Sequence, residues 1–379
     1  MNQRVQIENI DFLSRLALHQ SPRLRELKAH LAALNFDAAD PTAVGQTFHA
    51  LVNTGFDDLP NPSSGQTAER WNRIAAVAGR DLNLVKLFEG HTDALAILTE
   101  LGDGRHQPGW YWGVWAAESP EARVTATPTG EAEVVLNGVK SWCSGAAVLS
   151  HALVTGWEPD GTAGLYAVAL DRPGITLNGD IWKAVGMHPS ASVEVHFDRA
   201  SAIRVAAGNA YFERPGFWHG GAGIAACWFG AAVTLGQVVM REAELRPDPH
   251  RSAHLGHILA AVGSAAASLR EAAAAIDRMP RANVRWIALR TRLCVEHAAG
   301  LVLQHAGRAL GAATLCHDAQ VARLMADLPV FMRQSHAERD LAALGEFHAQ
   351  RDGNNRQRNF RKEIFSVACN GRRIDFVCT

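Results

Sequence analysis

LNGVKSWCSGA, residues 136–146, is the stretch that decides the fold. The pair Asn137-Gly138 is typical of a tight turn and interrupts an apolar run, so we expect a hairpin here. Trp142 and Ser144 follow two residues apart, a spacing that places both on one face of a strand. An indole and a hydroxyl on one face either pack into a core or bind one flat ligand.

The region around this stretch, residues 111–207, is built from short β-branched segments separated by turn residues. In one of them, Val193 and Val195 alternate with Glu194 and His196, as in a strand with one buried face. The pattern predicts a central domain of antiparallel strands.

Both flanks are helical in pattern. Residues 1–110 and 208–346 carry apolar side chains at three- and four-residue spacing. Pro280 is expected to follow the end of one long helix and Pro329 to kink or break another. Residues 347–379 are polar and basic and predict a solvated tail. The fold class is therefore α+β, and the junction of the domains is the expected place for a ligand.

Composition excludes several functions. The 379 residues have a formal net charge of -1, which gives no electrostatic reason to bind nucleic acid or an anionic membrane. No apolar run is long enough for a membrane span, and no secretory signal is evident, so we expect a cytoplasmic protein. The six cysteines are scattered and HExxH is absent, so no metal site is expected.

Four motifs in the same order resemble those of the acyl-CoA dehydrogenase superfamily. They are AAESP (116–120), LNGVKSWCSGA (136–146), AVGMHPSASVEVHFDRA (184–200) and LVLQHAGRALGAA (301–313). The resemblance covers about residues 10–345. It implies an N-terminal helical domain, a central β domain and a C-terminal four-helix bundle.

The resemblance also implies bound FAD. Trp142 takes the position of the aromatic residue against the isoalloxazine ring, and Ser144 that of the hydroxyl near flavin N5 and O4. Ala117 and Ser119 match residues that meet the flavin pyrimidine. Without the resemblance, Trp142 is equally well a half-buried core residue.

The far half of FAD is matched by two bundle residues. Arg246 stands where the family has an arginine that reaches the pyrophosphate across a dimer, although PDPH follows here instead of a Phe-Gly pair. Gln304 matches the glutamine at the adenine end, or is a polar residue on a helix surface. The resemblance implies a homodimer or homotetramer.

The catalytic base departs from the family. The usual glutamate aligns with Ser335, and Glu338 and Asp340 are offset from that place. A second place, used by some members, holds Glu213 next to Arg214. We take Glu213 as the candidate base, the alternative being a carboxylate that only stabilises a helix N-terminus.

The leading hypothesis is an FAD-dependent dehydrogenase of fatty acid metabolism, which removes hydrogens across a CH–CH bond of an acyl-CoA-like thioester. The electron acceptor stays open. One alternative is a monooxygenase of the same fold that uses reduced flavin and O₂, with His91 and His336 as candidate proton handlers. Another is a flavin-binding member without a base and without dehydrogenase activity.

Overall fold

The computed structural model describes residues 21–119, 122–179 and 181–349. Of these residues, those up to Gln334 pack together as one unit, and 335–349 belong to a second. The start of the predicted N-terminal domain, 1–20, and nearly all of the predicted tail, 350–379, lie outside the described residues.

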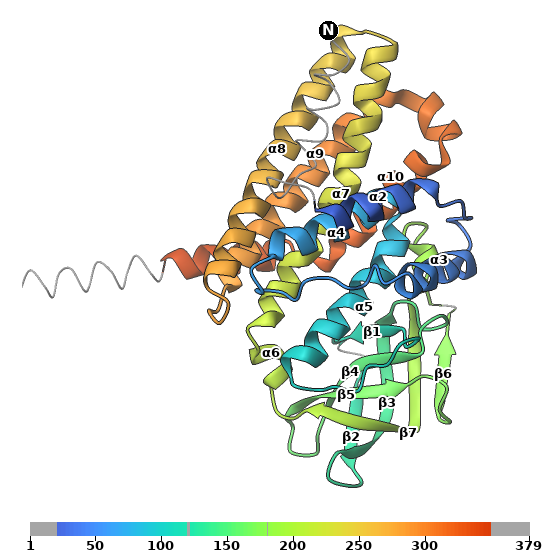
Figure 1. The fold of residues 1–379 in the computed structure, drawn as a ribbon, viewed down its shortest axis with the longest axis vertical. Coiled ribbons are helices and arrows are strands. Elements are labelled where there is room, and N and C mark those ends of the chain that lie inside the picture. Colours follow the sequence, from blue (N-terminus) through green and yellow to red (C-terminus); the bar gives the residue numbers. More distant parts are fainter. Residues whose placement is uncertain (1–20, 120–121, 180, 350–379) are drawn as a thin grey trace, which may run out of the picture. The chain divides into compact units, whose positions relative to one another are not determined.

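Four described helices precede the first strand, as the sequence predicts. They are α2 (Pro22–Ala33), α3 (Pro41–Asn53), α4 (Thr67–Arg80) and α5 (Leu82–Glu100). Three of them begin at a side chain, that of Ser21, Asp40 or Asp81, which accepts hydrogen bonds from backbone N–H groups of the first turn. Helix α5 packs on β1 and on α7, so it lies between the sheet and the later helices (Figure 1).

The described strands form one sheet that closes on itself. They are β1 (Trp112–Trp115), β2 (Val124–Pro128), β3 (Glu133–Cys143), β4 (His151–Trp157), β5 (Ala163–Ala169), β6 (Ile175–Asn178) and β7 (Val193–Ala206). The order is β1-β4-β2-β3-β7-β5, and a further β4–β5 pairing completes a ring. The prediction of antiparallel strands is wrong at two pairs, since β4 runs parallel to β1 and to β2. The chain makes a longer connection at these points, which allows parallel neighbours.

Strand β3 corrects a second expectation. Asn137 and Gly138 lie within the strand, so they form no hairpin. The pairing with β7 shifts register between Leu136 and Gly138, and Gly138 has a φ of 115°. A Cβ at Gly138 would collide with the Arg123 carbonyl oxygen. Glycine is therefore needed at this position, because the strand bulges here and the chain at the start of β2 approaches too closely for a side chain. The alternation in β7 is confirmed, with Val193 and Val195 buried.

Helices dominate the rest of the chain, as predicted. They are α6 (Ala210–Glu213), α7 (Gly216–Leu245), α8 (Pro249–Arg278), α9 (Arg285–His317) and α10 (Ala319–Phe331), with the short 3₁₀ turns η1 (His188–Ser190) and η2 (Met332–Gln334). Helix α8 ends before Pro280, and α9 is interrupted at Gly311. Pro329 lies inside α10, which ends two residues later. In the second unit, residues 338–349 are helical.

Small residues bring α7 close to α4. A Cβ at Gly230 would collide with the Ala75 carbonyl oxygen, and one at Gly223 would lie 3.2 Å from Nε1 of Trp71. Helices α7 and α8 are long and apolar enough to cross a membrane, but 67% and 50% of their apolar windows are buried within the protein. Such burial is typical of core helices.

Candidate functional site

The end of β3 presents Trp142 to solvent. Its side chain is 52% exposed and its φ of 57° lies in the left-handed region. The pairing of β3 with β7 is irregular between Lys140 and Cys143, where the strand ends, and Ser144 lies beyond it. Strand spacing therefore does not place Trp142 and Ser144 on one face, because the bulge breaks the alternation between them. Other contacts hold Ser144.

Ser144 stands at one end of three serine hydroxyls. Its Oγ lies 2.7 Å from Oγ of Ser192, which lies 2.9 Å from Oγ of Ser190. The backbone supports the arrangement, since Gly145 N donates to the Ser190 carbonyl at 2.9 Å. Trp115 Nε1 donates to the Ser144 carbonyl at 3.2 Å. The ends of β1 and β3 and the start of β7 therefore converge on Ser144.

Asp327 of α10 links the turn before β7, which contains Met187 and η1, to the helices. Its Oδ1 accepts a hydrogen bond from Met187 N at 2.6 Å, and its Oδ2 accepts one from Asn83 Nδ2 at 2.9 Å. Met187 has a φ of 59°, a conformation that is costly for a residue with a side chain. Burial raises the pKa of Asp327. The carboxyl group fixes the start of α5, the turn before β7 and α10 relative to one another.

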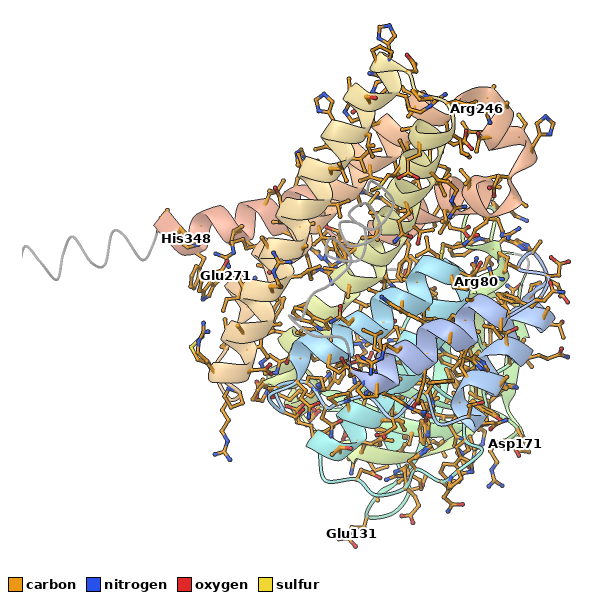
Figure 2. The ribbon with its side chains drawn as sticks, turned by 45° about the horizontal axis from the view of Figure 1, so that its top comes forward. Arg80, Glu131, Asp171, Arg246, Glu271 and His348 are labelled. Atoms are coloured by element: carbon orange, nitrogen blue, oxygen red, sulfur yellow. The ribbon has the colours of Figure 1, made fainter. Side chains whose placement is uncertain are left out.

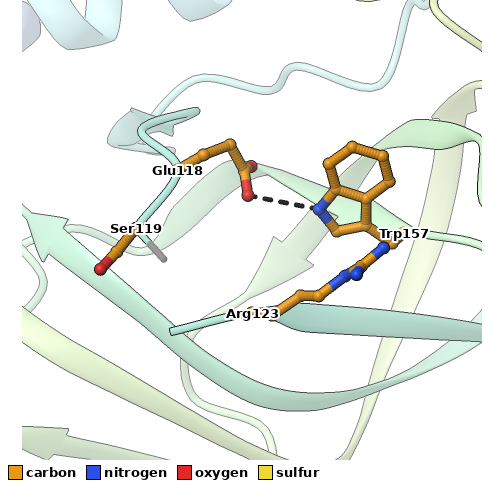
Figure 3. Close-up of a pocket in the computed structure, with 4 residues that line it drawn as sticks. All are labelled: Glu118, Ser119, Arg123 and Trp157. Atoms are coloured by element: carbon orange, nitrogen blue, oxygen red, sulfur yellow. Dashed lines mark hydrogen bonds between the residues drawn. The ribbon is translucent and has the colours of Figure 1, made fainter. Parts of the chain in front are cut away.

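Lys140 anchors the same end of the sheet from inside. The residue is 2% exposed, and its Nζ lies 2.7 Å from Glu118 Oε1 and 2.8 Å from Thr155 Oγ1. Burial lowers the pKa of Lys140, which the hydrogen bond and charge of Glu118 oppose. The other oxygen of Glu118 accepts a hydrogen bond from Trp157 Nε1 at 3.3 Å (Figure 3). Glu118 thus holds the segment after β1 against β3 and β4.

A pocket of about 340 Å³ adjoins this carboxylate and is lined by Glu118, Ser119, Arg123 and Trp157 (Figure 3). The Arg123 guanidinium lies 4.4 Å from the centre of the Trp157 ring. Of the two residues predicted to meet the flavin pyrimidine, Ser119 lines this pocket and Ala117 is exposed beside it. The Ser119 pocket is level with Asn137 of β3, because Trp157 pairs with Thr125 and Thr125 with Asn137, whereas Ser144 lies beyond the end of that strand.

Arg246 and Gln304 lie elsewhere. Arg246 follows the last residue of α7, with Nη2 3.0 Å from Glu242 Oε2, and Gln304 is exposed on α9. Figure 2 shows Arg246 at the end of the helices remote from the strand region, where Glu131 is labelled. Among the described residues, no hydrogen bond or ion pair joins either side chain to Trp142 or Ser144.

Glu213, the predicted base, is exposed at the end of α6. Its neighbour Arg214 is buried, and Nη1 of Arg214 lies 2.7 Å from Oε2 of Glu100. Glu100 Oε1 also accepts a hydrogen bond from Gly216 N at 2.8 Å. The buried partner of the Glu-Arg pair is therefore the arginine, which secures the start of α7.

The histidines proposed for the monooxygenase alternative already have partners. Buried His91 accepts a hydrogen bond at Nδ1 from Trp112 N at 3.1 Å, and its Nε2 lies 3.2 Å from Asp57 Oδ2. Nδ1 thus links α5 to β1, and Nε2 links α5 to the loop that follows α3. In the second unit, His336 Nδ1 lies 3.6 Å from Asp340 Oδ1.

The two other residues considered near the expected base position also lie in the second unit. Ser335 Oγ accepts a hydrogen bond from Ala337 N at 3.2 Å, and Glu338 begins the helical stretch 338–349. Ser335 is therefore already engaged in a local turn within that unit.

A line of charged residues on α5 was missed by the sequence reasoning. Lys86 Nζ lies 3.3 Å from Glu89 Oε2, and Asp93, one turn further on, lies 3.9 Å from Nη2 of Arg70. Burial raises the pKa of Glu89. The signal was present, because 86, 89 and 93 share one face of an otherwise apolar helix. Leu87, beside this face, contacts the backbone region of Gly145.

The residues at the end of β3 suit a flat ring with polar edges. Trp142 offers an exposed aromatic face, and Ser144, two residues further on, has a partly buried hydroxyl. A flavin is such a ring, and when bound it supplies the electron transfer that protein side chains cannot.

The fold is that of the acyl-CoA dehydrogenases and of the flavin-dependent monooxygenases that share it. No protein-family model matches the chain.

Particular solved structures show the range of this fold. KijD3, in complex with FMN and a dTDP-linked amino sugar, is 19% identical, with a TM-score of 0.73 over 88% of this chain and 95% of its own. Butyryl-CoA dehydrogenase from Megasphaera elsdenii is 13% identical, with a TM-score of 0.72 over 88% of this chain and 100% of its own.

One of the sequence relatives is a monooxygenase. Dibenzothiophene monooxygenase from Rhodococcus erythropolis is 29% identical over 142 residues, 33% of this chain and 34% of that protein. The match therefore spans about a third of the length of the curated relatives. The similar proteins are flavin enzymes of the oxidoreductase class.

Proposed function

We propose that the protein is a flavin-dependent monooxygenase that uses reduced flavin and O₂. The observation that carries this proposal is the exposed indole of Trp142 at the end of β3, followed by the partly buried Ser144 hydroxyl, which hydrogen-bonds a pair of buried serines. Removing hydrogens from a thioester needs a carboxylate over the α-carbon, whereas the candidate Glu213 is exposed at the end of α6. Similarity to dibenzothiophene monooxygenase supports the same choice.

We infer FMN rather than FAD as the flavin. The segment after Arg246 departs from the family pattern that holds the FAD pyrophosphate, since PDPH replaces the Phe-Gly pair. FMN lacks the adenosine half for which Gln304 was the candidate contact. KijD3, which shares the fold, binds FMN.

The reaction transfers one atom of O₂ to the substrate and releases the other as water, with two electrons from reduced flavin. In this scheme, Trp142 supports the ring and Ser144 fixes its polar edge. The turn held by Asp327 keeps Ser144 in position. Catalysis then depends on placement and exclusion of water more than on a strong base.

The test is reconstitution with a flavin reductase. The purified chain, FMN, NADH, the reductase and ¹⁸O₂ are incubated with dibenzothiophene or indole, with catalase present to remove free peroxide. We expect a product one oxygen atom heavier that carries the label and is lost with Trp142→Ala. Binding of FMN without labelled product from any sulfur or indole probe would argue against the monooxygenase.

Dehydrogenation is the second candidate, and the observation that favours it is Glu89. This carboxyl group lies on α5 with Lys86 as its ion-pair partner, and burial raises its pKa, as in many catalytic bases. Under anaerobic conditions, butyryl-CoA should then bleach the bound flavin, and Glu89→Gln should abolish the bleaching. An unchanged flavin spectrum in the presence of the thioester rules this candidate out.

A further inference from the structure

The three serines near the start of β7 form a chain with one fixed end. Ser190 Oγ donates to the Met187 carbonyl oxygen at 2.6 Å, and the chain continues through Ser192 to Ser144. Ser190 and Ser192 are 1% and 6% exposed, so water scarcely competes with these hydrogen bonds. Ser144, at the other end, is only partly buried.

The carbonyl sets the direction of every proton in the chain. A carbonyl oxygen only accepts, and each hydroxyl has one proton to donate. Because Ser190 gives its proton to Met187, the bond between Ser190 and Ser192 must be donated by Ser192. The single proton of the Ser192 hydroxyl is then taken by the bond to Ser190. The bond between Ser192 and Ser144 must therefore be donated by Ser144. Ser144 is left with oxygen lone pairs and no proton for a ligand.

The fixed end is itself held firmly. Met187 N donates to Asp327, and Ser190 N also donates to the Met187 carbonyl at 3.1 Å. The Ser190 carbonyl accepts from Gly145 N, directly after Ser144. Reversing the hydroxyls would take the Ser190 proton away from the Met187 carbonyl oxygen and leave that oxygen with the Ser190 N–H as donor, which forfeits a buried hydrogen bond. The chain therefore keeps Ser144 as a hydrogen-bond acceptor.

We propose that Ser190 and Ser192 are positioning residues that make Ser144 select reduced over oxidised flavin. The inference rests on the proposed function, in which the flavin ring lies against Trp142 with N5 near Ser144. Oxidised N5 and O4 only accept hydrogen bonds, whereas reduced N5 carries a proton. An acceptor at Ser144 pairs with the reduced form and leaves the oxidised form without a donor.

The test compares the affinity for FMN in its two redox states. Dissociation constants are measured aerobically for FMN and anaerobically for dithionite-reduced FMN, together with the midpoint potential of the bound flavin. We expect the wild-type chain to bind reduced FMN at least tenfold more tightly. For a two-electron couple, each tenfold preference raises the potential by about 30 mV.

Two variants should free the Ser144 proton so that the hydroxyl can donate to a ligand. Ser190→Ala lets Ser192 donate toward Ser144, and Ser192→Ala removes the acceptor of the Ser144 proton. Both should bring the affinity ratio toward one and lower the potential. Ser141→Ala is the matched control, because its buried hydroxyl bonds Glu194 and lies outside the chain. It should keep the wild-type ratio.

The possible outcomes distinguish failure of the serine-chain role from failure of the proposed flavin-dependent function. If wild-type and both variants bind reduced and oxidised FMN with the same ratio, the serine chain has no such role. If the wild-type chain and the Ser141→Ala control bind neither form, the proposed function fails and the serine role falls with it. Circular dichroism of each variant establishes that the altered chain is folded.

Discussion

At Trp142, a large aromatic side chain is held where water reaches about half of it, at 52% exposure. Its left-handed backbone is costly for a bulky residue and persists only because neighbouring contacts impose it. Trp115 holds the Ser144 carbonyl and Gly145 pairs with Ser190, which fixes the chain on the far side of Trp142. The half-exposed side chain gains little packing from this strained conformation, so we attribute the conformation to ligand binding.

Trp142→Ala should therefore separate binding from stability. About half of the Trp142 side chain is exposed, so the melting temperature should fall by only a few degrees, whereas FMN affinity should fall about tenfold with the loss of stacking. Fluorescence quenching of FMN gives the affinity. Met279→Ala, at an exposed residue after α8, is the control and should leave binding unchanged. Equal FMN affinity in the wild-type chain and Trp142→Ala would remove the tryptophan from the site.

The sequence predicts Trp142 and Ser144 as site residues, but it does not reveal the contacts that hold them. Both stand in a motif, whereas Ser190 and Ser192 gain their role from a turn whose left-handed residue, Met187, is not one that favours such a conformation. Asp327 was equally hidden, since its partners lie 140 and 244 residues away. Spacing along the chain carries no information about such contacts.

At the level of elements, Asp81 at the start of α5 makes the free energy of unfolding depend on pH. Burial raises the pKa of Asp81 from 3.8 to about 6, while Oδ1 of Asp81 accepts hydrogen bonds from Asn83 N and Leu84 N. The folded chain keeps this proton up to about pH 6, whereas the unfolded chain loses it near pH 4. The free energy of unfolding therefore falls as pH rises between these values, by about 3 kcal/mol at most.

Asp81→Asn should remove this dependence. The amide oxygen keeps the cap and carries no charge, so the variant should be more stable than the wild-type chain by about 1–3 kcal/mol at pH 7.5 and nearly equal at pH 4. Thermal melting at both values measures the difference. Asp81→Ala loses the cap as well and should gain less. A constant difference at both pH values would contradict the assignment.

The close approach of α4 and α7 gives a packing prediction. Gly230→Ala places a Cβ against the Ala75 carbonyl and should lower the free energy of unfolding by about 3 kcal/mol. Gly221→Ala, on the same helix, meets nothing within 4 Å and should raise it by up to about 1 kcal/mol. Urea denaturation compares the two, and effects of the same sign would contradict the packing described.

Helices and strands were predictable because burial repeats along the chain with a period that sequence shows. The exceptions have physical causes. Asn137-Gly138 has the composition of a turn, but Arg123 of the neighbouring strand segment approaches so closely that glycine is needed inside β3. Likewise β4 is a parallel neighbour of β1, because strand order is set by contacts between distant segments, which a local pattern does not show.

At the scale of the whole molecule, the predicted site residues divide into two groups. Trp142 and Ser144 lie at the end of the sheet, and Arg246 lies at the far end of α7 (Figure 2). Arg246 is largely exposed, and its ion pair with Glu242 is of a kind that contributes little. We propose that a second copy of the chain supplies its Arg246 to the flavin phosphate.

Subunit complementation tests this arrangement. Chains with Trp142→Ala and with Arg246→Ala, carrying different tags, are co-expressed and the mixed oligomer is isolated. Each homo-oligomer should bind FMN weakly, whereas the mixed dimer has one intact site of two and should bind about half an equivalent per chain. Wild-type affinity in Arg246→Ala alone would show that one chain suffices.

The hydrogen bond from Met187 to Asp327 also constrains biosynthesis. The turn before β7 leaves the ribosome 140 residues before the carboxylate that completes it. At typical translation rates, this delay is roughly 7 to 28 seconds. During that time the nascent strands can pair, but the serine turn waits for α10, so a stalled or truncated chain would carry a folded sheet that is unable to take up its ligand.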